Sequence, residues 1–372
     1  MIYILSYYNL ESKNGGANRL ESFKTYLSKF HNVDFLSLST NFNKKELLNY
    51  WKNSNIFIKS WVLSNKFLFY LGITLVKDPY YKKQALSYYE SKISSADTLI
   101  VSYPTIDDVL IGIKVFEKFN CKLNIDFRDS LLKFPLENLS RFQMWRLKKI
   151  FLKIGSKDKV YATGVSSPIC KDLNRYFRKT NLITNFRLLN NINQIKPNLR
   201  KNINVLYFGS LESSYKRGLS IFSEALSKLC LENKEKEFSF DFFGEYSKSE
   251  ISKFKSLKKI HNLHLNFLKP TPIENLNQYD FAILLGVPNY PAYVSSKFFS
   301  YLELNLPIIG STNGNQVGEY IKKYSVGYSY AFDEQFILKG YHELKKAEYL
   351  YTSDLSIFSS EEVLNKWRNV IS

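Results

Sequence analysis

The chain has 372 residues, of which 45% are hydrophobic, 16% aromatic and 23% charged. This composition excludes an intrinsically disordered chain, and the length favours two domains over a single core. The formal net charge of +18 is unevenly divided, because residues 1–188 contribute +15 (30 basic, 15 acidic) and residues 189–372 contribute +3 (22 basic, 19 acidic). We therefore expect the first half to meet an anionic partner, with nucleic acid, phospholipid headgroups and a lipid-linked pyrophosphate all open.

Short apolar runs alternate with helical patterns in residues 1–188. The run Ile2–Tyr7 predicts a strand rather than a signal peptide, because it lacks a basic lead and a small-residue cleavage site. Asn18–Phe30 has the apolar spacing of a helix. The further strands predicted here are Val33–Leu38, Thr98–Ser102, Leu123–Phe127 and Lys159–Ala162, and the further helices are Ile106–Phe119 and Arg141–Lys153. Such alternation predicts a parallel sheet with helices on both faces.

A polar stretch with one proline, residues 189–203, predicts a linker, after which the pattern restarts. The predicted strands are then Asn204–Phe208, Phe238–Phe243, Leu263–Phe267, Phe281–Leu285 and Pro307–Gly310, and the helices are Leu219–Leu229, Ser296–Leu304, Val317–Lys323 and Glu361–Val370. The sequence thus predicts an α/β fold of two Rossmann-like, doubly wound domains that face each other across a cleft. The first domain spans residues 1–188 and is joined by a C-terminal helix in residues 356–372; the second spans residues 204–355.

The stretch Ser295–Gly310, SSKFFSYLELNLPIIG, combines a polar turn, a helix start and a strand led by proline. Ser295 and Ser296 suit a helix cap, and the N–H groups of a helix start carry partial positive charge that can hold a diphosphate. Lys297 adds a full positive charge at the same place. The alternative is an ordinary capped helix with a surface lysine.

This stretch resembles the K-x-x-E-Y-L-x-x-G-x-P-V-I element of glycosyltransferases with the GT-B fold, especially those of family 4. Other segments resemble elements of that family in the same order: YFGSL at 207–211 with KRG at 216–218, FFG at 242–244, and NFLKP at 266–270. The first half agrees, with GGANR at 15–19, IDFRD at 125–129, GVSS at 164–167 and ITN at 183–185. The resemblance covers roughly residues 1–330, and the ordered set is more specific than any one motif.

The resemblance implies that the second domain holds a nucleoside-diphosphate sugar, with UDP as the expected nucleotide, and that the first domain holds the acceptor. The donor-binding residues that it implies are Gly209, Ser210, Lys216, Arg217, Gly244, Leu268, Ser295, Ser296, Lys297, Ser300 and Glu303.

The sequence departs from the family at two acidic positions. Family 4 enzymes usually carry two glutamates eight positions apart, the second lying seven positions before the proline. Counting back from Pro307 gives Ser300 and Ala292, neither of which is acidic. Ser300 is expected to hydrogen-bond a ribose hydroxyl more weakly than a carboxylate would. Glu303, one helical turn further on, either takes over the ribose or is a solvated helix residue.

Two further departures affect the glycine and arginine of the family pattern. Asn305 stands where the family has the glycine before the proline, and Ser210 stands at its arginine. The phosphate charge is therefore expected to rest on Lys216, Arg217 and Lys297.

A glycine turn near the N-terminus is a candidate acceptor or phosphate loop. Gly15 and Gly16 allow close backbone approach to a ligand, although a plain loop at this place needs glycine too. Arg19 lies one helical turn further on, where it is suited to meet an anion.

The end of the strand at 123–127 carries the candidate catalytic residues. Asp126, Arg128 and Asp129 lie at or beyond its carboxyl end, where ligands gather in such sheets. Arg128 matches the position at which many relatives carry an active-site histidine. Asp129 is expected to orient the acceptor hydroxyl or take its proton. The alternative is an Arg–Asp pair that braces the loop.

The cysteines and histidines indicate neither a disulfide framework nor a metal site. Cys121, Cys170 and Cys230 are odd in number and far apart, so we expect small buried hydrophobes in a reducing compartment. The four histidines lie apart without ligand spacing. Asp107 and Asp108 are expected to form the acidic first turn of a helix. We therefore predict metal-independent chemistry without a cofactor, in which Lys, Arg and helix N-termini balance the phosphate charge.

Two basic, aromatic segments of the first domain suit the interfacial layer of an anionic membrane. Arg141–Lys153 is a cationic amphipathic helix, and Trp51–Val76 is aromatic with scattered lysines that interrupt its apolar run. No spanning helix is expected, because no segment reaches about 18 uncharged apolar residues. The alternative for the Trp145 face is packing on its own sheet. The expected location is cytoplasmic, at the inner face of the cytoplasmic membrane.

These inferences predict a retaining, hexosyltransferase-type glycosyltransferase that acts on a glycan or lipid-linked glycan. The richness in Lys, Asn, Ile and Phe resembles enzymes of cell-surface polysaccharide synthesis (O-antigen or capsule) in AT-rich bacteria. The missing glutamates support a second hypothesis, a catalytically silent GT-B homologue that binds glycan or a partner transferase. A nucleic-acid-binding protein, suggested by the net charge, lacks a recognisable binding module.

Overall fold

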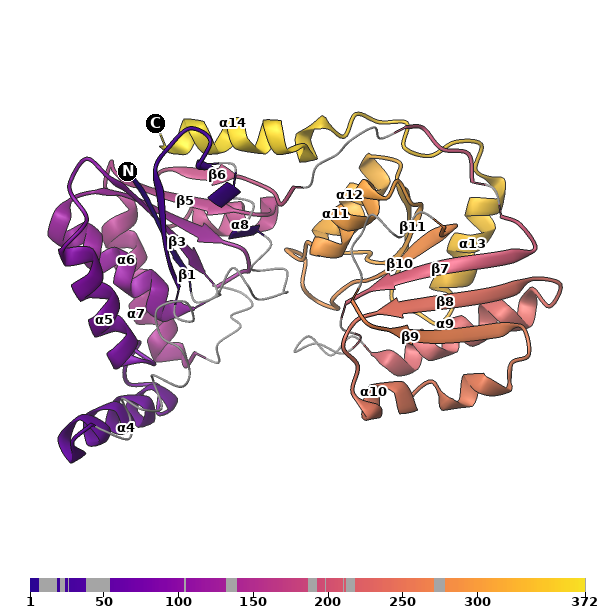
Figure 1. Cartoon of the computed structure of the whole chain (residues 1–372), viewed down its shortest axis with the longest axis horizontal. Coiled ribbons are helices and arrows are strands. Elements are labelled where there is room, and N and C mark those ends of the chain that lie inside the picture. Colours follow the sequence, from indigo (N-terminus) through magenta and orange to yellow (C-terminus); the bar gives the residue numbers. More distant parts are fainter. Residues whose placement is uncertain are drawn as a thin grey trace. The chain divides into compact units, whose positions relative to one another are not determined.

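The chain divides into two compact units, shown in Figure 1. Unit 1 comprises Met1–Thr184 and Leu364–Ser372, and unit 2 comprises Asn185–Val363. The computed structural model describes residues 1–6, 19–20, 24–25, 27–37, 54–103, 105–131, 139–186, 193–197, 199–209, 211, 218–270 and 278–371. Each unit contains a six-stranded parallel sheet with flanking helices, which confirms the predicted α/β fold class.

The sheet of unit 1 has the strand order β2-β1-β3-β4-β5-β6, and all of its neighbouring strands are parallel. Its strands are β1 (Ile2–Ser6), β2 (Val33–Ser37), β3 (Thr98–Tyr103), β4 (Lys122–Phe127), β5 (Val160–Gly164) and β6 (Thr180–Leu182). Every residue of β1 and β3 is buried, so both faces of the sheet are covered, because successive side chains point to opposite faces. The strand order reverses between β1 and β3, whose carboxyl ends form the switch point where such sheets bind ligands.

The helices of unit 1 are held by specific caps and carboxylates. Those whose bounds the structure describes are α4 (Ile56–Tyr70), α5 (Pro79–Glu90), α6 (Ile106–Phe119), α7 (Arg141–Gly155), α8 (Ser167–Leu173) and the later part of α14 (Ser360–Ile371). Asp107 and Asp108 lie in the first turn of α6, as predicted. Asp107 accepts hydrogen bonds from the backbone N–H groups of Lys77 and Asp78 at 3.0 and 2.7 Å, and Asp108 accepts one from the Tyr81 hydroxyl at 2.6 Å. The two carboxylates thereby fix the start of α5 against α6.

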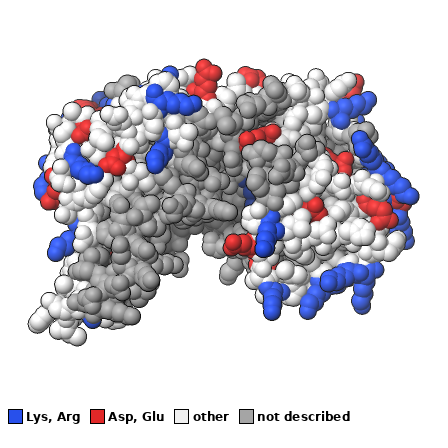
Figure 2. All heavy atoms as spheres, viewed as in Figure 1, with Lys and Arg blue, Asp and Glu red and all other residues white. Residues whose placement is uncertain are grey.

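The surface of α4 differs from that of the other helices of unit 1. In Figure 1, α4 projects from the lower left of unit 1, and in Figure 2 the described atoms seen there are mostly white, with little blue. Large apolar side chains are exposed along it, among them Phe57 (80% exposed) and Phe67 (64%). In the described part of the chain, no helix is long and apolar enough to cross a membrane.

The sheet of unit 2 repeats this plan with the order β12-β11-β10-β7-β8-β9. Its strands are β7 (Asn202–Phe208), β8 (Glu237–Phe243), β9 (Leu263–Leu268), β10 (Phe281–Leu285), β11 (Ile308–Ser311) and β12 (Gly327–Ser329). The order reverses between β7 and β10, which are parallel neighbours with Phe281 beside Val205. The carboxyl ends of β7 and β10 are therefore the switch point of unit 2.

The helices of unit 2 pack on the sheet through an aromatic core. The helical segments are α9 (Leu219–Glu232), α10 (Lys248–Ser252), η1 (Lys255–Lys259), α11 (Ser296–Glu303), α12 (Gln316–Lys323), α13 (Phe336–Lys346), η3 (Ser356–Phe358) and the start of α14. Phe222 of α9 lies 6.1 Å from Phe242 of β8 and 6.4 Å from Phe336 of α13, measured between ring centroids. Phe242 stacks on Phe267 of β9 at 5.0 Å. These rings join two strands of the sheet and two helices in one apolar cluster.

Most predicted elements occur within a few residues of their expected ends, but the helices α4 and α5 and several shorter elements were not predicted. β6 and β12 have three residues each and lack an apolar run, and α13 has Gly340 in its middle. The polar stretch 189–203 was predicted as a linker; within it, Ile195 forms an antiparallel bridge with Leu350, and β7 already begins at Asn202.

Candidate functional site

A lysine lies at the switch point of unit 2. Lys297, in the first turn of α11, donates a hydrogen bond from Nζ to the Tyr207 hydroxyl at 2.8 Å, and the same Nζ lies 4.1 Å from the centroid of the Tyr207 ring. Tyr207 is the penultimate residue of β7. A side chain that starts on the helix after β10 therefore ends over the carboxyl end of β7, and its cationic head is half-buried at the place where these sheets bind ligands.

Two glycines form the surface beside this lysine. Gly209, directly after β7, has a φ of +74°, and a Cβ on it would lie 3.0 Å from Cε of Lys297. Gly244, directly after β8, leaves room for the Tyr246 side chain, whose hydroxyl donates to the Gly209 carbonyl at 3.1 Å. Burial raises the pKa of Tyr246, so this hydroxyl keeps its proton. The lack of a side chain at both strand ends thus lets the Lys297 and Tyr246 side chains approach the backbone closely.

The ends of β7, β8 and β9 lie in one hydrogen-bonded row. The N–H of Gly209 donates to the Phe243 carbonyl at 2.7 Å, and the N–H of Gly244 donates to the Leu268 carbonyl at 3.0 Å. Leu268 is the last residue of β9 and is 38% exposed. The structure therefore brings four predicted donor residues, Gly209, Gly244, Leu268 and Lys297, to one edge of the sheet.

The start of α11 is capped by its own serine. The Ser295 side chain accepts a hydrogen bond from the Lys297 N–H at 3.3 Å, so it satisfies one of the amides that a diphosphate would otherwise meet. Ser296 is half-buried beside it. Ser300 lies one turn after Lys297 and is 7% exposed, and Glu303 is half-buried at the end of the helix.

The loop between β10 and α11 is held from below by a buried asparagine. Asn315 accepts a hydrogen bond from the Val287 N–H at 3.1 Å and donates to the carbonyls of Val287 and Tyr290, each at 2.9 Å. The N–H of Gln316, in α12, also donates a hydrogen bond to the carbonyl of Pro291 in this loop at 2.7 Å. Ala292, at the first glutamate position of family 4, is buried in this loop.

The end of α11 explains how asparagine replaces the family glycine. Asn305 has a φ of +54°, in the left-handed region. Its N–H donates to the Leu302 carbonyl at 3.0 Å, and the N–H of Leu306 donates to the Tyr301 carbonyl at 3.1 Å. This is the double hydrogen bond that ends many helices, for which glycine or asparagine is preferred. The Asn305 side chain also donates to the Asn193 carbonyl at 3.0 Å.

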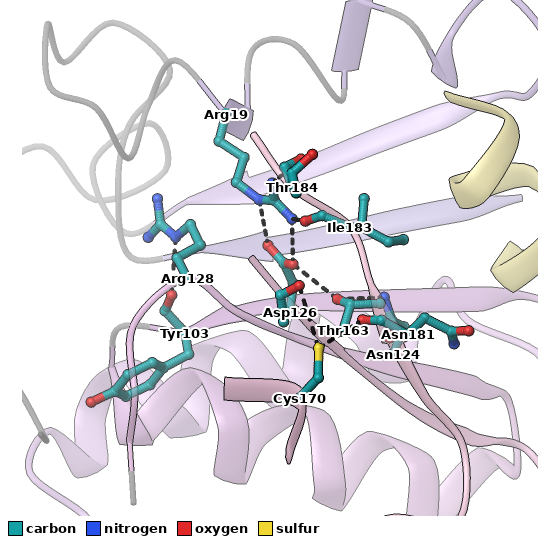
Figure 3. Close-up of polar contacts among 11 residues, drawn as sticks. Arg19, Tyr103, Asn124, Asp126, Arg128, Thr163, Cys170, Asn181, Ile183 and Thr184 are labelled. Carbon is teal, nitrogen blue, oxygen red and sulfur yellow. Dashed lines mark hydrogen bonds and ion pairs between the residues drawn. The ribbon is translucent and has the colours of Figure 1, made fainter. Parts of the chain in front are cut away.

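In unit 1, two predicted acceptor-site residues are bound to each other (Figure 3). Arg19 donates two hydrogen bonds to Asp126, from Nε at 3.0 Å and from an Nη at 2.8 Å. The Arg19 side chain is 2% exposed and that of Asp126 is fully buried. Arg19 also donates to the carbonyls of Ile183 and Thr184, and Asp126 accepts from the Thr163 hydroxyl at 2.9 Å. This arrangement ties four segments of unit 1 together and does not present Arg19 to a ligand.

The predicted catalytic residues lie beside the switch point of unit 1. Arg128 donates from Nε to the carbonyl of Tyr103, the last residue of β3, at 3.0 Å. Arg128 and Asp129 are both half-buried. The bracing Arg–Asp pair considered for this strand end thus exists, but it joins Asp126 to Arg19.

The remaining predicted residues, Gly15, Gly16, Ser210, Lys216 and Arg217, lie outside the described residues. Sequence analysis missed Tyr207, Tyr246 and Asn315, because tyrosine in an apolar strand and asparagine in a polar loop are both unremarkable in sequence. A partial signal existed for Tyr207, because alternation along the strand NVLYF places its side chain on the opposite face of the sheet from Leu206 and Phe208.

Cys121 and Cys230 are buried, as expected, whereas Cys170 is half-buried and its thiol donates to the carbonyls of Gly164 and Asn181. Burial raises the pKa of Cys121 and Cys170 to about 11 and that of Cys230 to about 12. Within the residues for which the structure gives positions, no three His, Cys, Asp or Glu side chains gather as metal ligands would.

Comparison with protein-family models gives no match, and comparison with curated protein sequences gives none either. Solved structures are similar to the chain in fold. WaaG, a glycosyltransferase involved in lipopolysaccharide biosynthesis, has a TM-score of 0.54 at 11% identity, over 100% of this chain and 95% of WaaG. The UDP-GlcNAc 2-epimerase from Methanocaldococcus jannaschii has a TM-score of 0.53 at 10% identity, over 99% of this chain and 98% of the epimerase.

TarM has a TM-score of 0.53 at 12% identity, over 78% of this chain, and the matched region spans only 58% of TarM. Together with the two parallel six-stranded sheets, these likenesses establish that the fold is of the GT-B class.

Proposed function

We propose that the chain is a glycosyltransferase whose unit 2 binds the diphosphate of a nucleoside-diphosphate sugar at the carboxyl ends of β7 and β10. The observation that carries the proposal is the position of Lys297, whose ammonium group lies over the end of β7 beside Gly209. A cation, a positive-φ glycine and a helix start at one switch point are the features that suit a diphosphate. The ordered sequence resemblance to family 4 supports a transferase over other users of the fold.

The chemistry follows from the charge that develops on the leaving nucleoside diphosphate. A fixed lysine and the partial positive charge of the α11 start stabilise that charge without a metal ion. We propose UDP as the nucleotide, and retention of the anomeric configuration as in family 4. Ser300, close to Lys297 on α11, is the proposed partner of a ribose hydroxyl, and Arg128 and Asp129 of unit 1 are the proposed contacts of the acceptor hydroxyl.

The proposed acceptor is a glycan or lipid-linked glycan of cell-surface polysaccharide synthesis, met at the cytoplasmic face of a membrane. The basic excess of residues 1–188 and the cationic helix α7 support an anionic surface as the place of reaction. The likeness in fold to a glycosyltransferase of lipopolysaccharide biosynthesis agrees with such an acceptor.

A thermal-shift screen with UDP, GDP and CMP tests the donor half of the proposal. A ligand at about 100 times its Kd raises the free energy of unfolding by about 2.7 kcal/mol, so a single matching nucleotide should raise Tm clearly. The nucleotide so identified is then supplied as a set of sugar conjugates with glycan acceptors, and mass spectrometry detects the new glycoside. NMR of the anomeric proton reports retention or inversion. Failure of all three nucleotides to shift Tm would overturn the proposal.

The variant Lys297→Met removes the charge and keeps the apolar stem. We expect the affinity for the nucleoside diphosphate to fall about 10–100-fold, because a charge-assisted hydrogen bond contributes about 1.5–3 kcal/mol. Affinity for the bare nucleoside should change little. Lys322→Met, at an exposed lysine of α12, is the matched control. Equal losses for nucleoside and nucleotide would indicate general damage, and an unchanged nucleotide affinity would remove the diphosphate from this site.

A catalytically silent homologue is the second candidate, and Ala292 and Ser300 favour it. Both positions are buried and neither can supply a carboxylate. This candidate predicts nucleotide or glycan binding without turnover. Transfer or donor hydrolysis by the purified protein would exclude it.

A further inference from the structure

α4 and α7 carry their large apolar side chains outward. On α4, Ile56, Leu63, Phe67 and Tyr70 recur at spacings of seven, four and three residues, so they lie along one face, and they are 56–76% exposed. Only Val62 and Phe69 of this helix are buried. A helix that packs on a core has the opposite arrangement, with its apolar stripe turned inward.

α7 has two distinct faces. Its buried face consists of Gln143, Leu147, Phe151 and Ile154 with Gly155. The packing of the Trp145 face on the sheet, considered in the sequence analysis, is wrong, because Trp145 is 51% exposed and stacks on the exposed Phe142 at 5.7 Å. Nζ of Lys149 lies 3.8 Å from the centroid of the Trp145 ring. The outward face of α7 therefore combines aromatic rings with cations.

Hydrogen bonds hold the end of α4 against the start of α7. Gln143 of α7 donates from Nε2 to the Phe69 carbonyl at 3.0 Å, and Arg146 donates to the Ile73 carbonyl at 2.7 Å. The Ser140 hydroxyl, which caps α7, donates to the Gly72 carbonyl at 3.2 Å. The carbonyl groups that end α4 are thus satisfied by side chains of α7, so the two outward faces belong to one fixed part of unit 1.

The charge on this surface is of one sign. Ser54–Lys77 contains three lysines and no acidic residue, and Arg141–Gly155 contains five basic residues and no acidic one. A second copy of the chain placed on the same surface would oppose like charges. An anionic bilayer instead complements the cations and also accepts the apolar side chains.

We propose that α4 and the outward face of α7 form one docking surface that inserts into the interfacial layer of an anionic bilayer. α4 has 15 residues, so it is about 22 Å long, shorter than the hydrocarbon core of about 30 Å; it lies in the interface and does not cross it. Single-stranded nucleic acid would use the aromatic rings for stacking, but it gives no role to the exposed Ile56, Leu63 and Ile73. The inference rests on the proposed function only in the purpose that it gives the docking surface, which is to bring a lipid-linked acceptor to unit 1.

The first test removes apolar side chains and keeps every charge. The full chain is floated with vesicles of equimolar phosphatidylglycerol and phosphatidylcholine, without donor. Phe57→Ser with Phe67→Ser should lower vesicle affinity about 100-fold, since burial of each ring contributes about tenfold. Leu231→Ser, at a side chain of unit 2 that is 53% exposed, should have no effect. Tm and nucleotide affinity of each variant, measured without vesicles, report folding and the donor site independently.

The second test reverses charge on α7. Lys148→Glu with Lys149→Glu should lower affinity for the same vesicles about tenfold or more, and the loss should shrink at high salt. Lys258→Glu with Lys259→Glu, on η1 of unit 2, is the matched control and should bind as the unaltered protein does.

Four outcomes would overturn the proposal. They are no binding of the unaltered protein to the anionic vesicles, equal binding to pure phosphatidylcholine, unchanged binding of the double Phe variant, and an effect of that variant only on oligomeric state or on binding to a single-stranded oligonucleotide. Vesicle binding without nucleotide binding would uphold the docking surface and reject the proposed function. Nucleotide binding without vesicle binding would reject the docking surface and uphold the proposed function.

Discussion

Each unit holds a cation at the carboxyl edge of its parallel sheet, but the two units use that cation in different ways. In unit 1, Arg19 is 2% exposed and forms a bidentate pair with the fully buried Asp126. In unit 2, Lys297 is half-buried and its described hydrogen bond goes to the neutral hydroxyl of Tyr207. Arg19 thus closes the edge of its unit, whereas Lys297 keeps part of its surface exposed at the edge of the other.

The difference shows that the position of a basic residue near a strand end does not define its role. In the sequence Arg19 comes shortly after two glycines and Lys297 directly after two serines, and both were assigned to ligand binding from their position and the family resemblance. What separates them is the buried carboxylate at the end of β4, because a buried arginine without such a partner would be strongly unfavourable. The side chain that lies beside the cation decides whether the cation can meet a ligand, and that side chain is known only from the fold.

The largest effect is expected from a variant that removes the buried carboxylate partner of Arg19. Asp126→Ala leaves Arg19 buried without its carboxylate, and we expect the free energy of unfolding to fall by about 3–5 kcal/mol in urea titrations. Lys114→Ala, which breaks an exposed pair with Glu117, should cost about 0.5 kcal/mol or less. A similar small loss for both variants would mean that the Arg19 pair is no more structural than a surface one.

The second prediction concerns the hydrogen bonds that support the loop before α11 in unit 2. Asn315→Ala removes three hydrogen bonds below the loop between β10 and α11 and should lower the free energy of unfolding by about 1–3 kcal/mol. Because that loop leads into Lys297, nucleotide affinity should fall as well. Asn313→Ala, two residues away and exposed, is the control. Reduced stability with unaltered nucleotide affinity would show that the loop does not contribute to nucleotide binding.

The smallest expected effect concerns the end of α11. Asn305→Ala should destabilise the protein by about 1 kcal/mol, because alanine is strained at a φ of +54°. Asn305→Gly should cost much less, since glycine accepts that angle. Equal losses for the two variants in urea titrations would instead assign the effect to the hydrogen bond from Asn305 to the Asn193 carbonyl.

Much of the fold could be predicted from the sequence, because buried parallel strands are short continuous apolar runs. β10 was predicted at its observed ends, and α6 likewise. β6 and β12 could not be found, since three-residue strands at sheet edges carry no periodic signal. β1 was predicted as Ile2–Tyr7 and is described from Ile2 to Ser6, and Tyr7 lies outside the described residues.

The candidate site was predictable only where motif and topology coincide. Gly209 and Gly244 directly follow predicted strands and Lys297 lies in the first turn of a predicted helix, so their meeting at one edge could be expected. The pairing of Arg19 with Asp126 joins residues 107 positions apart and follows no sequence spacing. The support from Tyr207 and Asn315 was likewise invisible, because it depends on which side chains face each other across elements.

The helix α14 gives unit 1 a particular order of assembly. Unit 1 is discontinuous, since residues 364–372 complete it after the whole of unit 2 has been passed. Within unit 1, the guanidinium of Arg368 lies 3.7 Å from the centroid of the Phe30 ring, and Nζ of Lys122 donates to the Ile371 carbonyl at 3.0 Å. During synthesis on the ribosome, domains fold from the N-terminus as they emerge. Unit 1 nevertheless cannot complete these contacts until residue 371 has left the exit tunnel, by which time all of unit 2 has already emerged.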